Sequence, residues 1–509
     1  MRSRHVQALA AITAVAALVR FSTLDLQSFW LDEAFTVDLL RRDLWGMLRE
    51  LPEHEATPPL YYLLAWLWSQ PFGLGEVGLR SLSALIGTAT VPVAYAAAAA
   101  LVSRRAGLIA AALVAVSPLL VWYSQEARSY ELLALIGGLS FLYFARALEQ
   151  PGRRSLAREE SDSRPLAPEE PGRRSLVLWA VWSGLALLTH YYAAFLVVPE
   201  ALWLVIASRR PRPVLYAAAA VLAVGAALIP LALAQEDNVG RIRGQSLVER
   251  ALQVPKQFLV GFDLAAEVAL AILACVLALA GVALVLLRGS ERERRGAVTA
   301  GALGGIAVAV PALLAVAGID YLLGRNLIFA AIPLTVAISA GFGAARAGAV
   351  GPACAAGLCA ICAVALVSVW TRPEFQRDDW RAAAEALGDP PPGGRAVVVT
   401  PGAGVVPLRA VYLRGARELR PSESATVTGV EALGLAADQP GVTSGEDEPG
   451  AAPPTPPAFT PAGQETGEGF ALFRFRAPQP VPVTPEQIQG SRVDRTLPSG
   501  AILVEPGSP

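Results

Sequence analysis

Long apolar runs recur between residues 6 and 370 and constrain this chain more than any other feature. Many of these runs, rich in Ala, Leu and Val, reach the roughly 20 residues that a helix needs to cross a bilayer. Hydrophobic residues make up 54% of the 509 residues and charged residues 17%, against about 25% charged residues in an average soluble domain. A soluble core cannot absorb so many apolar helices, so the sequence predicts an α-helical polytopic membrane protein.

The apolar runs predict about eleven membrane helices. One further segment, Pro58 to Trp68, is aromatic and apolar but short, and we interpret it as a helix that lies on the membrane surface. The expected crossings lie near residues 6–24, 79–102, 106–122, 130–148, 176–189, 191–207, 214–234, 267–287, 297–317, 326–345 and 350–370.

Arginine is distributed unevenly between alternate connections, and this asymmetry predicts the orientation. Cytoplasmic loops are enriched in Lys and Arg. The arginine-bearing connections are 103–105, 149–175, 208–213, 288–296 and the stretch near Arg346, whereas 25–78, 123–129, the turn at His190, 235–266 and 318–325 hold fewer arginines per residue. We therefore expect a multi-pass protein of the cytoplasmic membrane, with a cytoplasmic N-terminus and residues 371–509 outside.

Composition changes after Trp370 and predicts a second domain. Residues 376–387 read as a short helix, and 396–400, 470–475 and 501–504 as strands. The stretch 435–468 is dense in Pro, Gly, Thr and Glu and is predicted to be disordered. We expect a catalytic transmembrane domain over 1–370 and a small extracytoplasmic α/β domain over 371–509. Loop 149–175, which contains Pro-Gly-Arg-Arg-Ser-Leu twice, is predicted to be a flexible linker.

Charge and cysteine usage exclude two classes of function. The net charge of −1 argues against nucleic acid as a partner. The cysteines lie inside apolar runs, and no second Cys pair or nearby His completes a zinc site. We interpret them as packing residues of membrane helices.

Polar residues suited to catalysis gather in the predicted outer connections. Adjacent carboxylates beside a lipid face are costly to desolvate unless they serve a role, and two such residues follow the first membrane helix directly. The candidates are Asp32, Glu33, His54, Glu55, Arg80, Glu126, Arg128, His190 and Arg325.

These residue types suit three parts of one reaction. Arg80, Arg128 and Arg325 suit a phosphate, through charge-assisted bidentate hydrogen bonds. A carboxylate suits a general base that activates an acceptor hydroxyl. Glu55 and His190 are ligand types suited to a divalent metal cation. A phosphate-bearing lipid donor and a hydroxyl acceptor would use all three.

Six segments in order resemble the GT-C membrane glycosyltransferases, in particular glycosyltransferase family 39, the branch of protein O-mannosyltransferases and the lipid A aminoarabinose transferase. A seventh, Asp379-Trp-Arg381, resembles the exit from the last helix in bacterial relatives. The six are Leu31-Asp-Glu-Ala34, Thr57-Pro-Pro-Leu-Tyr-Tyr62, Arg80-Ser-Leu-Ser83, Ser124-Gln-Glu-Ala-Arg-Ser-Tyr130, Thr189-His-Tyr-Tyr192, and Arg325 ahead of Pro333.

The resemblance implies an inverting transfer of a hexosyl or pentosyl group outside the cytoplasmic membrane. It implies a polyprenyl-phosphate sugar as donor, an acceptor hydroxyl on a lipid, glycan or protein, and Asp32 as the general base, beside Glu33. Two other classes stay open: a transporter or flippase of lipid-linked substrates, and a membrane scaffold. The candidate charges cluster at one membrane face, which disfavours a transport pathway through the midplane.

Overall fold

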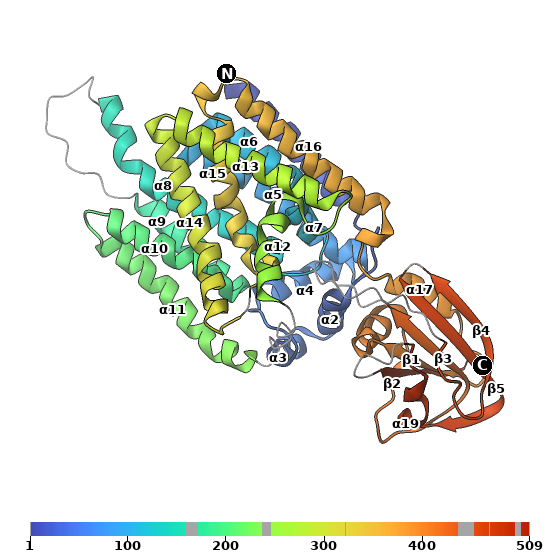
Figure 1. The fold of residues 1–509 in the computed structure, drawn as a ribbon. Helices are drawn as coiled ribbons and strands as arrows, with labels where there is room; N and C mark the ends of the chain where they lie inside the picture. Colours follow the sequence, from blue (N-terminus) through green and yellow to red (C-terminus); the bar gives the residue numbers. More distant parts are fainter. Residues whose placement is uncertain are drawn as a thin grey trace. The chain divides into compact units, whose positions relative to one another are not determined.

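The computed structural model describes residues 2–158, 172–236, 246–320, 322–435, 452–467, 469–493 and 500–507 (Figure 1). The chain forms two compact units. The helical unit comprises Met1–Leu24 and Leu44–Ser368, and the C-terminal unit comprises Asp25–Asp43 and Val369–Pro509. Residues 25–43, part of the first predicted outer connection, thus belong to the C-terminal unit. The sequence analysis includes them in the transmembrane domain over 1–370.

Each of the eleven predicted crossings is helical in the structure. They are α1 (Arg2–Phe21), α5 (Glu76–Leu101), α6 (Arg104–Val116) with α7 (Pro118–Ser124), α8 (Tyr130–Arg158), α9 (Arg173–Thr189), α10 (Ala194–Ala207), α11 (Arg212–Ala234), α13 (Glu267–Arg288), α14 (Glu291–Val316), η3 (Gly324–Ala330) with α15 (Ala331–Phe342), and α16 (Val350–Thr371).

Within the described residues, eight helical segments are long and apolar enough to cross a membrane. A ninth is the pair α6 and α7, bent by 55°. The bend falls at Ser117 and Pro118, where the proline cannot donate a helical hydrogen bond and Ser117 caps the new helix by accepting from the Leu120 N–H. The remaining two, α9 and the apolar segment Tyr191–Ala207, are shorter. The predicted polytopic helical fold is confirmed.

Four further helices lie between the crossings: α2 (Leu31–Leu40), α3 (Leu44–His54), α4 (Leu60–Phe72) and α12 (Leu247–Val260). Helix α4 is the predicted surface helix, and Pro58 and Pro59 precede it. Its Trp68 indole donates to the Gly78 carbonyl at 3.1 Å and to the Ser81 hydroxyl at 3.0 Å, which fixes α4 against the start of α5.

Two sequence predictions need correction. The loop 149–175 begins with helix, because α8 continues to Arg158; residues 159–171 lie outside the described residues. The predicted disordered stretch 435–468 contains strand β4 (Thr460–Gly467), whereas 436–451 and 468 are not described. Strand β4 pairs along β5 (Phe470–Val483), and backbone hydrogen bonds to a neighbour compensate for its weak strand composition.

The C-terminal unit is a mixed sheet with the strand order β2-β6-β1-β3-β5-β4. Strand β1 (Arg395–Thr400) pairs in parallel with β3 (Ala425–Leu435) and antiparallel with β6 (Ala501–Glu505), and β2 (Arg417–Glu418) closes that edge. The unit also contains η5 (Pro373–Phe375), α17 (Trp380–Leu387), η6 (Gly402–Gly404), α18 (Val405–Pro407), η7 (Leu408–Tyr412), α19 (Pro485–Ile488) and η8 (Gln489–Ser491).

Both faces of this sheet are covered. Val397 and Val399 of β1 pack with Trp380 of α17 on one face, while Ala396 and Val398 belong to the core of the other face, with Ile488 of α19. Successive side chains of a strand point to opposite faces, so the continuous apolar run of β1 predicts this two-sided burial.

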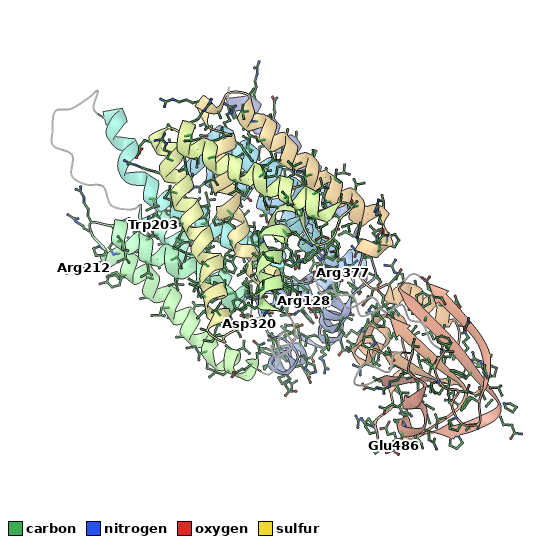
Figure 2. All side chains as sticks on the ribbon, viewed as in Figure 1. Arg128, Trp203, Arg212, Asp320, Arg377 and Glu486 are labelled. Carbon is green, nitrogen blue, oxygen red and sulfur yellow. The ribbon has the colours of Figure 1, made fainter. Side chains whose placement is uncertain are left out.

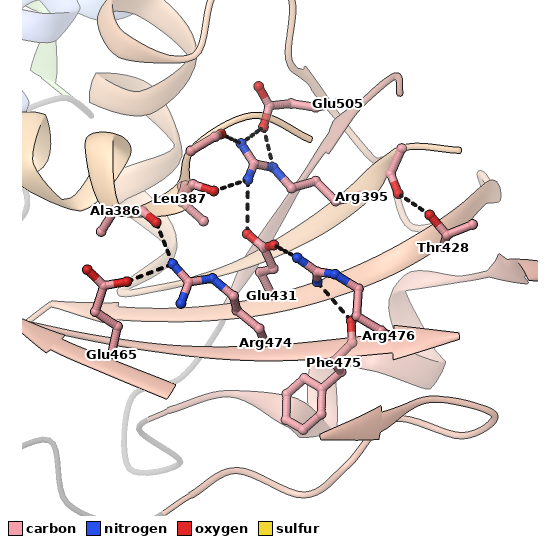
Figure 3. Close-up of polar contacts among 12 residues, drawn as sticks. Ala386, Leu387, Arg395, Thr428, Glu431, Glu465, Arg474, Phe475, Arg476 and Glu505 are labelled. Atoms are coloured by element: carbon pink, nitrogen blue, oxygen red, sulfur yellow. Dashed lines mark hydrogen bonds and ion pairs between the residues drawn. The ribbon is translucent and has the colours of Figure 1, made fainter. Parts of the chain in front are cut away.

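A charged network crosses four strands of the sheet (Figure 3). Arg395 is fully buried and bonds the carboxylates of Glu431, at 3.1 Å, and Glu505, at 2.6 Å. Arg476 reaches the second oxygen of Glu431 at 2.8 Å. Buried charges persist in proteins when they are paired in this way, so the network joins β1, β3, β5 and β6.

Candidate active site

The predicted outer connections meet at one end of the helical unit, here called the site end, where α1 finishes and α8 begins. Arg80 of α5 donates to the Leu24 carbonyl at 2.9 Å. Gln235, which follows α11, donates to the Thr57 carbonyl at 3.2 Å and accepts from the Tyr191 hydroxyl at 2.6 Å. Three separate connections, 25–78, the turn at His190 and 235–266, are therefore joined there.

At the opposite end of the helical unit, arginine side chains bind neighbouring segments in the connections that the sequence predicts to be cytoplasmic. Arg105 donates to the Gly348 carbonyl at 3.2 Å, and Arg292 donates to the Ala100 carbonyl at 3.1 Å. The arginine-bearing connections 103–105, 288–296 and the stretch near Arg346 thus lie at the end of the unit away from the site cluster.

Arg128 and Glu55 form a bidentate ion pair at the site end (Figure 2 labels Arg128). The two terminal guanidinium nitrogens of Arg128 donate to the two Glu55 oxygens at 2.5 Å and 2.8 Å. The side chains are 9% and 3% exposed. Removing one member of such a buried pair costs roughly 3–5 kcal/mol, because the other charge is left uncompensated. Glu55 therefore neutralises Arg128 in this structure.

His190 lies beside this pair, buried between α9 and η1 (Tyr191–Ala193). Burial, reinforced by the charges of Arg128 and Arg325, holds the pKa of His190 well below its ordinary value. The Tyr192 N–H donates to His190 Nδ1 at 3.2 Å. Since a backbone N–H can only donate, Nδ1 carries no proton, and the neutral ring carries its proton on Nε2. His190 thus presents an Nε2–H donor.

Arg325 completes what we call the site cluster: Glu55, Arg128, His190 and Arg325. Its guanidinium lies 5.9 Å from the Tyr130 ring centroid, and the Tyr130 ring lies 6.4 Å from the His190 ring. Tyr130 thereby packs between two members of the cluster. The cluster combines guanidinium donors and an imidazole N–H donor, a combination that suits an anion.

Contacts outside the cluster fix the segment that carries Arg325. Arg250 of α12 forms a bidentate pair with Asp320 and donates to the Leu322 carbonyl at 2.9 Å (Figure 2 labels Asp320). A Cβ at Gly324 would lie 1.9 Å from Gln257 Oε1, so a side chain there would require the end of the Gln257 side chain of α12 to move.

The sequence analysis did not identify the residues that support the Arg128 segment. Arg20 of α1 donates to the Ser124 hydroxyl at 3.0 Å and to the Ala115 carbonyl at 2.8 Å. Gln125 donates to the Thr23 hydroxyl at 2.5 Å. These bonds fix the α7–α8 connection to the end of α1. The sequence did contain a signal for this role, because Arg20 lies within an apolar run. Charged residues are rare in membrane helices and usually face the interior of the helix bundle.

Glu200 of α10 is a second buried ionisable residue that the sequence analysis missed. Its Oε2 accepts from the Ser140 hydroxyl at 2.5 Å and from the Trp179 indole at 2.9 Å. It joins α8, α9 and α10 and places an ionisable side chain in the interior of the helical unit.

The remaining candidates lie in different environments. Glu126 is buried in the α7–α8 connection, two residues from Arg128. His54 is exposed at the end of α3, and its Nδ1 lies 3.1 Å from the Glu50 carbonyl. The bond from Arg80 to the Leu24 carbonyl places Arg80 at the same end of the unit as the site cluster.

Glu55 and His190 do not fit a shared metal ion. Both Glu55 oxygens are bound by Arg128. For His190 Nε2 to coordinate a metal, its proton would have to move to Nδ1, which would break the bond from the Tyr192 N–H. Two nearby guanidinium charges would also repel a cation. A group with metal-ligand spacing does occur at Glu50, Glu53 and His54, on α3.

Asp32 and Glu33 lie in the C-terminal unit, at the start of α2. Glu33 is buried, and its carboxylate lies 3.7 Å from Arg377 and accepts from the Trp30 N–H at 3.4 Å. Asp32 is partly exposed. The first outer connection is fixed within this unit by further bonds, from the Phe29 N–H to the Tyr412 hydroxyl at 2.7 Å and from the Arg377 N–H to Gln27 at 2.9 Å.

Comparison with known families agrees with these motifs. Residues 56–157 match the sequence profile of the family described as dolichyl-phosphate-mannose-protein mannosyltransferase. Over that segment, this chain resembles membrane mannosyltransferases. The match contains three of the six segments that predicted the resemblance, those at Thr57, Arg80 and Ser124, and it confirms that prediction. Among curated proteins, none matches the chain.

Solved structures with a similar chain course include two of ArnT from Cupriavidus metallidurans. The apo form has 17% identity and a TM-score of 0.42, and covers 66% of this chain and 59% of its own. The form bound to undecaprenyl phosphate has 15% identity and a TM-score of 0.46, and covers 78% of this chain and 83% of its own. This chain thus spans 59% of the apo ArnT chain.

A third similar structure is the Archaeoglobus fulgidus oligosaccharyltransferase in complex with Zn and sulfate. It has 13% identity and a TM-score of 0.43, with 75% of this chain and 57% of that chain covered. Likenesses of this degree carry no argument about function.

Proposed function

We propose that this protein is an inverting glycosyltransferase that moves a sugar from a polyprenyl-phosphate donor to an acceptor hydroxyl. The reaction would take place at the outer face of the cytoplasmic membrane, where we place the site end. The supporting observation is the site cluster, in which Arg128, His190 and Arg325 come from three connections of the helical unit. Guanidinium groups and an imidazole N–H are suited to a phosphate that leaves as an anion.

The proposed chemistry is a single displacement. The acceptor oxygen attacks the anomeric carbon as its proton passes to the Asp32 carboxylate, and the bond between that carbon and the phosphate oxygen breaks. The bonding electrons leave with the polyprenyl phosphate, whose negative charge Arg325 and the neighbouring donors stabilise. No general acid is needed for this leaving group. We assign Asp32 its role from the family resemblance of Leu31-Asp-Glu-Ala34.

Glu33 is the neighbouring carboxylate and the obvious rival base. Its contacts with Arg377 and the Trp30 N–H give it a structural role, because they hold a buried carboxylate in place at the start of α2. Asp32, which is partly exposed, is better suited to meet an acceptor.

The test is to incubate the purified protein with labelled polyprenyl-phosphate sugars and envelope extract, and to identify the labelled product. Asp32→Asn keeps the shape of the side chain and removes its basicity, so transfer should fall by about 10²–10⁴-fold. Asp25→Asn makes the same change at an exposed position of the same connection and serves as the control. Wild-type turnover by folded Asp32→Asn would remove Asp32 from the mechanism.

A further inference from the structure

The Glu55–Arg128 pair occupies the atoms of Arg128 that would bind a phosphate. Both terminal guanidinium nitrogens of Arg128 donate to the two oxygens of the Glu55 carboxylate. Carboxylate and phosphate present two oxygens to a guanidinium in the same parallel geometry. Arg128 therefore cannot hold Glu55 and a donor phosphate in this way at the same time.

The surroundings of the pair favour an exchange of anions. Glu55 and Arg128 are both buried, and the charges of Arg128 and Arg325 both act on His190. The Arg128 guanidinium also lies over the Tyr62 ring of α4, 5.9 Å from its centroid. In such a low-dielectric setting an arginine needs an anion, and an anion that leaves must be replaced.

We propose that Glu55 is a resident anion that the donor phosphate displaces from Arg128, and that it makes the site selective for phosphates able to contact several donors. This inference rests on the proposed function. A simple monovalent anion would gain only the contacts that Glu55 already makes. A phosphate bridging Arg128, Arg325 and His190 Nε2–H gains more, and so displaces the carboxylate.

The exchange predicts that removing the Glu55 carboxylate, which contacts Arg128 at the site, strengthens ligand binding instead of weakening it. In Glu55→Gln, Arg128 keeps its charge and loses its competitor. Affinity for polyprenyl phosphate should rise by roughly 10–100-fold, the equivalent of a charge-assisted hydrogen bond at about 1.5–3 kcal/mol. Inorganic phosphate should also raise the unfolding temperature of the variant, while leaving that of the wild type unchanged.

The experiment measures binding of polyprenyl phosphate and the thermal shift with inorganic phosphate, using the full chain in detergent. Glu249→Gln, which changes an exposed carboxylate of α12, is the matched control. Glu55→Asp is the second variant if Glu55→Gln does not fold, because its shorter carboxylate keeps the charge but loses the bidentate reach. It should show the same direction of change.

The outcomes separate this inference from the proposed function. Tighter binding in Glu55→Gln, with no change in Glu249→Gln, supports the exchange. Equal or weaker binding in folded Glu55 variants overturns it and leaves the glycosyltransferase proposal intact. Polyprenyl phosphate that binds neither wild type nor variant contradicts both. A thermal shift with inorganic phosphate, in a variant that does not bind polyprenyl phosphate, contradicts the lipid-linked ligand. It identifies free phosphate as the anion that displaces Glu55.

Discussion

The Arg377 guanidinium lies 3.7 Å from the Glu33 carboxylate, and both side chains are buried. Arg377 also lies over the Trp30 ring, 5.4 Å from its centroid. The contact joins the connection after the first membrane helix to the chain that follows the last one. The residue next to the proposed base is thus fixed by a partner far away in the sequence.

Loss of Arg377 should destabilise the C-terminal unit strongly. Arg377→Gln removes a positive charge next to the buried Glu33 carboxylate, so the free energy of unfolding should fall by roughly 3–5 kcal/mol. Adding Glu33→Gln should restore part of the loss. The control is Arg409→Gln, because the Arg409–Asp38 pair, at 3.8 Å, is 39% and 31% exposed and such pairs contribute about 0–1 kcal/mol. Denaturant unfolding measures all three, and equal losses in Arg377→Gln and Arg409→Gln would contradict the assignment.

Arg325 should contribute directly to donor binding. Arg325→Gln removes a charged donor from the site cluster, so affinity for polyprenyl phosphate should weaken by about 10–100-fold, or roughly 1.5–3 kcal/mol. Arg49→Gln changes an exposed arginine of α3 and should leave the affinity unchanged. Equilibrium binding with a labelled lipid distinguishes the two, and unchanged affinity in Arg325→Gln would exclude Arg325 from the phosphate site.

Stability should depend on pH through His190. The pKa of His190 in the folded protein is lowered by burial and by Arg128 and Arg325. In the unfolded chain His190 therefore takes up a proton near its ordinary pKa, whereas in the folded protein its ring stays neutral. Stability should therefore be lost as pH falls below about 6.5, by up to roughly 1.4 kcal/mol per pH unit. His190→Gln should lack this component. Unfolding temperatures between pH 7 and pH 5 measure the difference, and parallel curves for the two proteins would contradict it.

Exhaustive chelation should leave transfer activity unchanged. The reason is the His190 ring, whose Nδ1 accepts from the Tyr192 N–H and whose Nε2 therefore carries the proton. The measurement compares turnover before and after chelator treatment, with added Mg²⁺, Mn²⁺ or Zn²⁺. Loss of activity that a divalent ion restores would contradict this expectation, and variants of Glu50, Glu53 and His54 would then show whether the α3 group binds the ion.

The orientation in the membrane can be tested with single cysteines placed in a cysteine-free background. Ser422→Cys in the C-terminal unit should react with an impermeant reagent applied to intact cells, whereas Arg209→Cys, between α10 and α11, should react only after permeabilisation. Both positions are exposed, so accessibility of the side chain does not decide the result. Labelling of Arg209→Cys from outside would reverse the topology proposed from the arginine distribution.

Hydrophobic patterning by itself located the membrane helices, because a crossing needs a continuous apolar run and that requirement is local. All eleven predicted runs are helical, and the candidate residues of the outer connections lie at one end of the helical unit or in the C-terminal unit. Strands β1 and β6 were predicted for the same local reason, from short apolar runs. Strand β4 was missed because its formation depends on pairing with β5.

Tertiary structure alone decided the partners of the charged residues. Glu55 was predicted to bind a metal and Arg128 a phosphate, yet they pair with each other across 73 residues. The placement of the His190 proton on Nε2 follows from a backbone N–H that the fold aims at Nδ1. Arg20, an arginine in an apolar run, gains its role from Ser124 and from carbonyls of α6. The residue type fixes which bonds a side chain can make, but a buried charge takes whichever partner the packing of distant segments brings within reach.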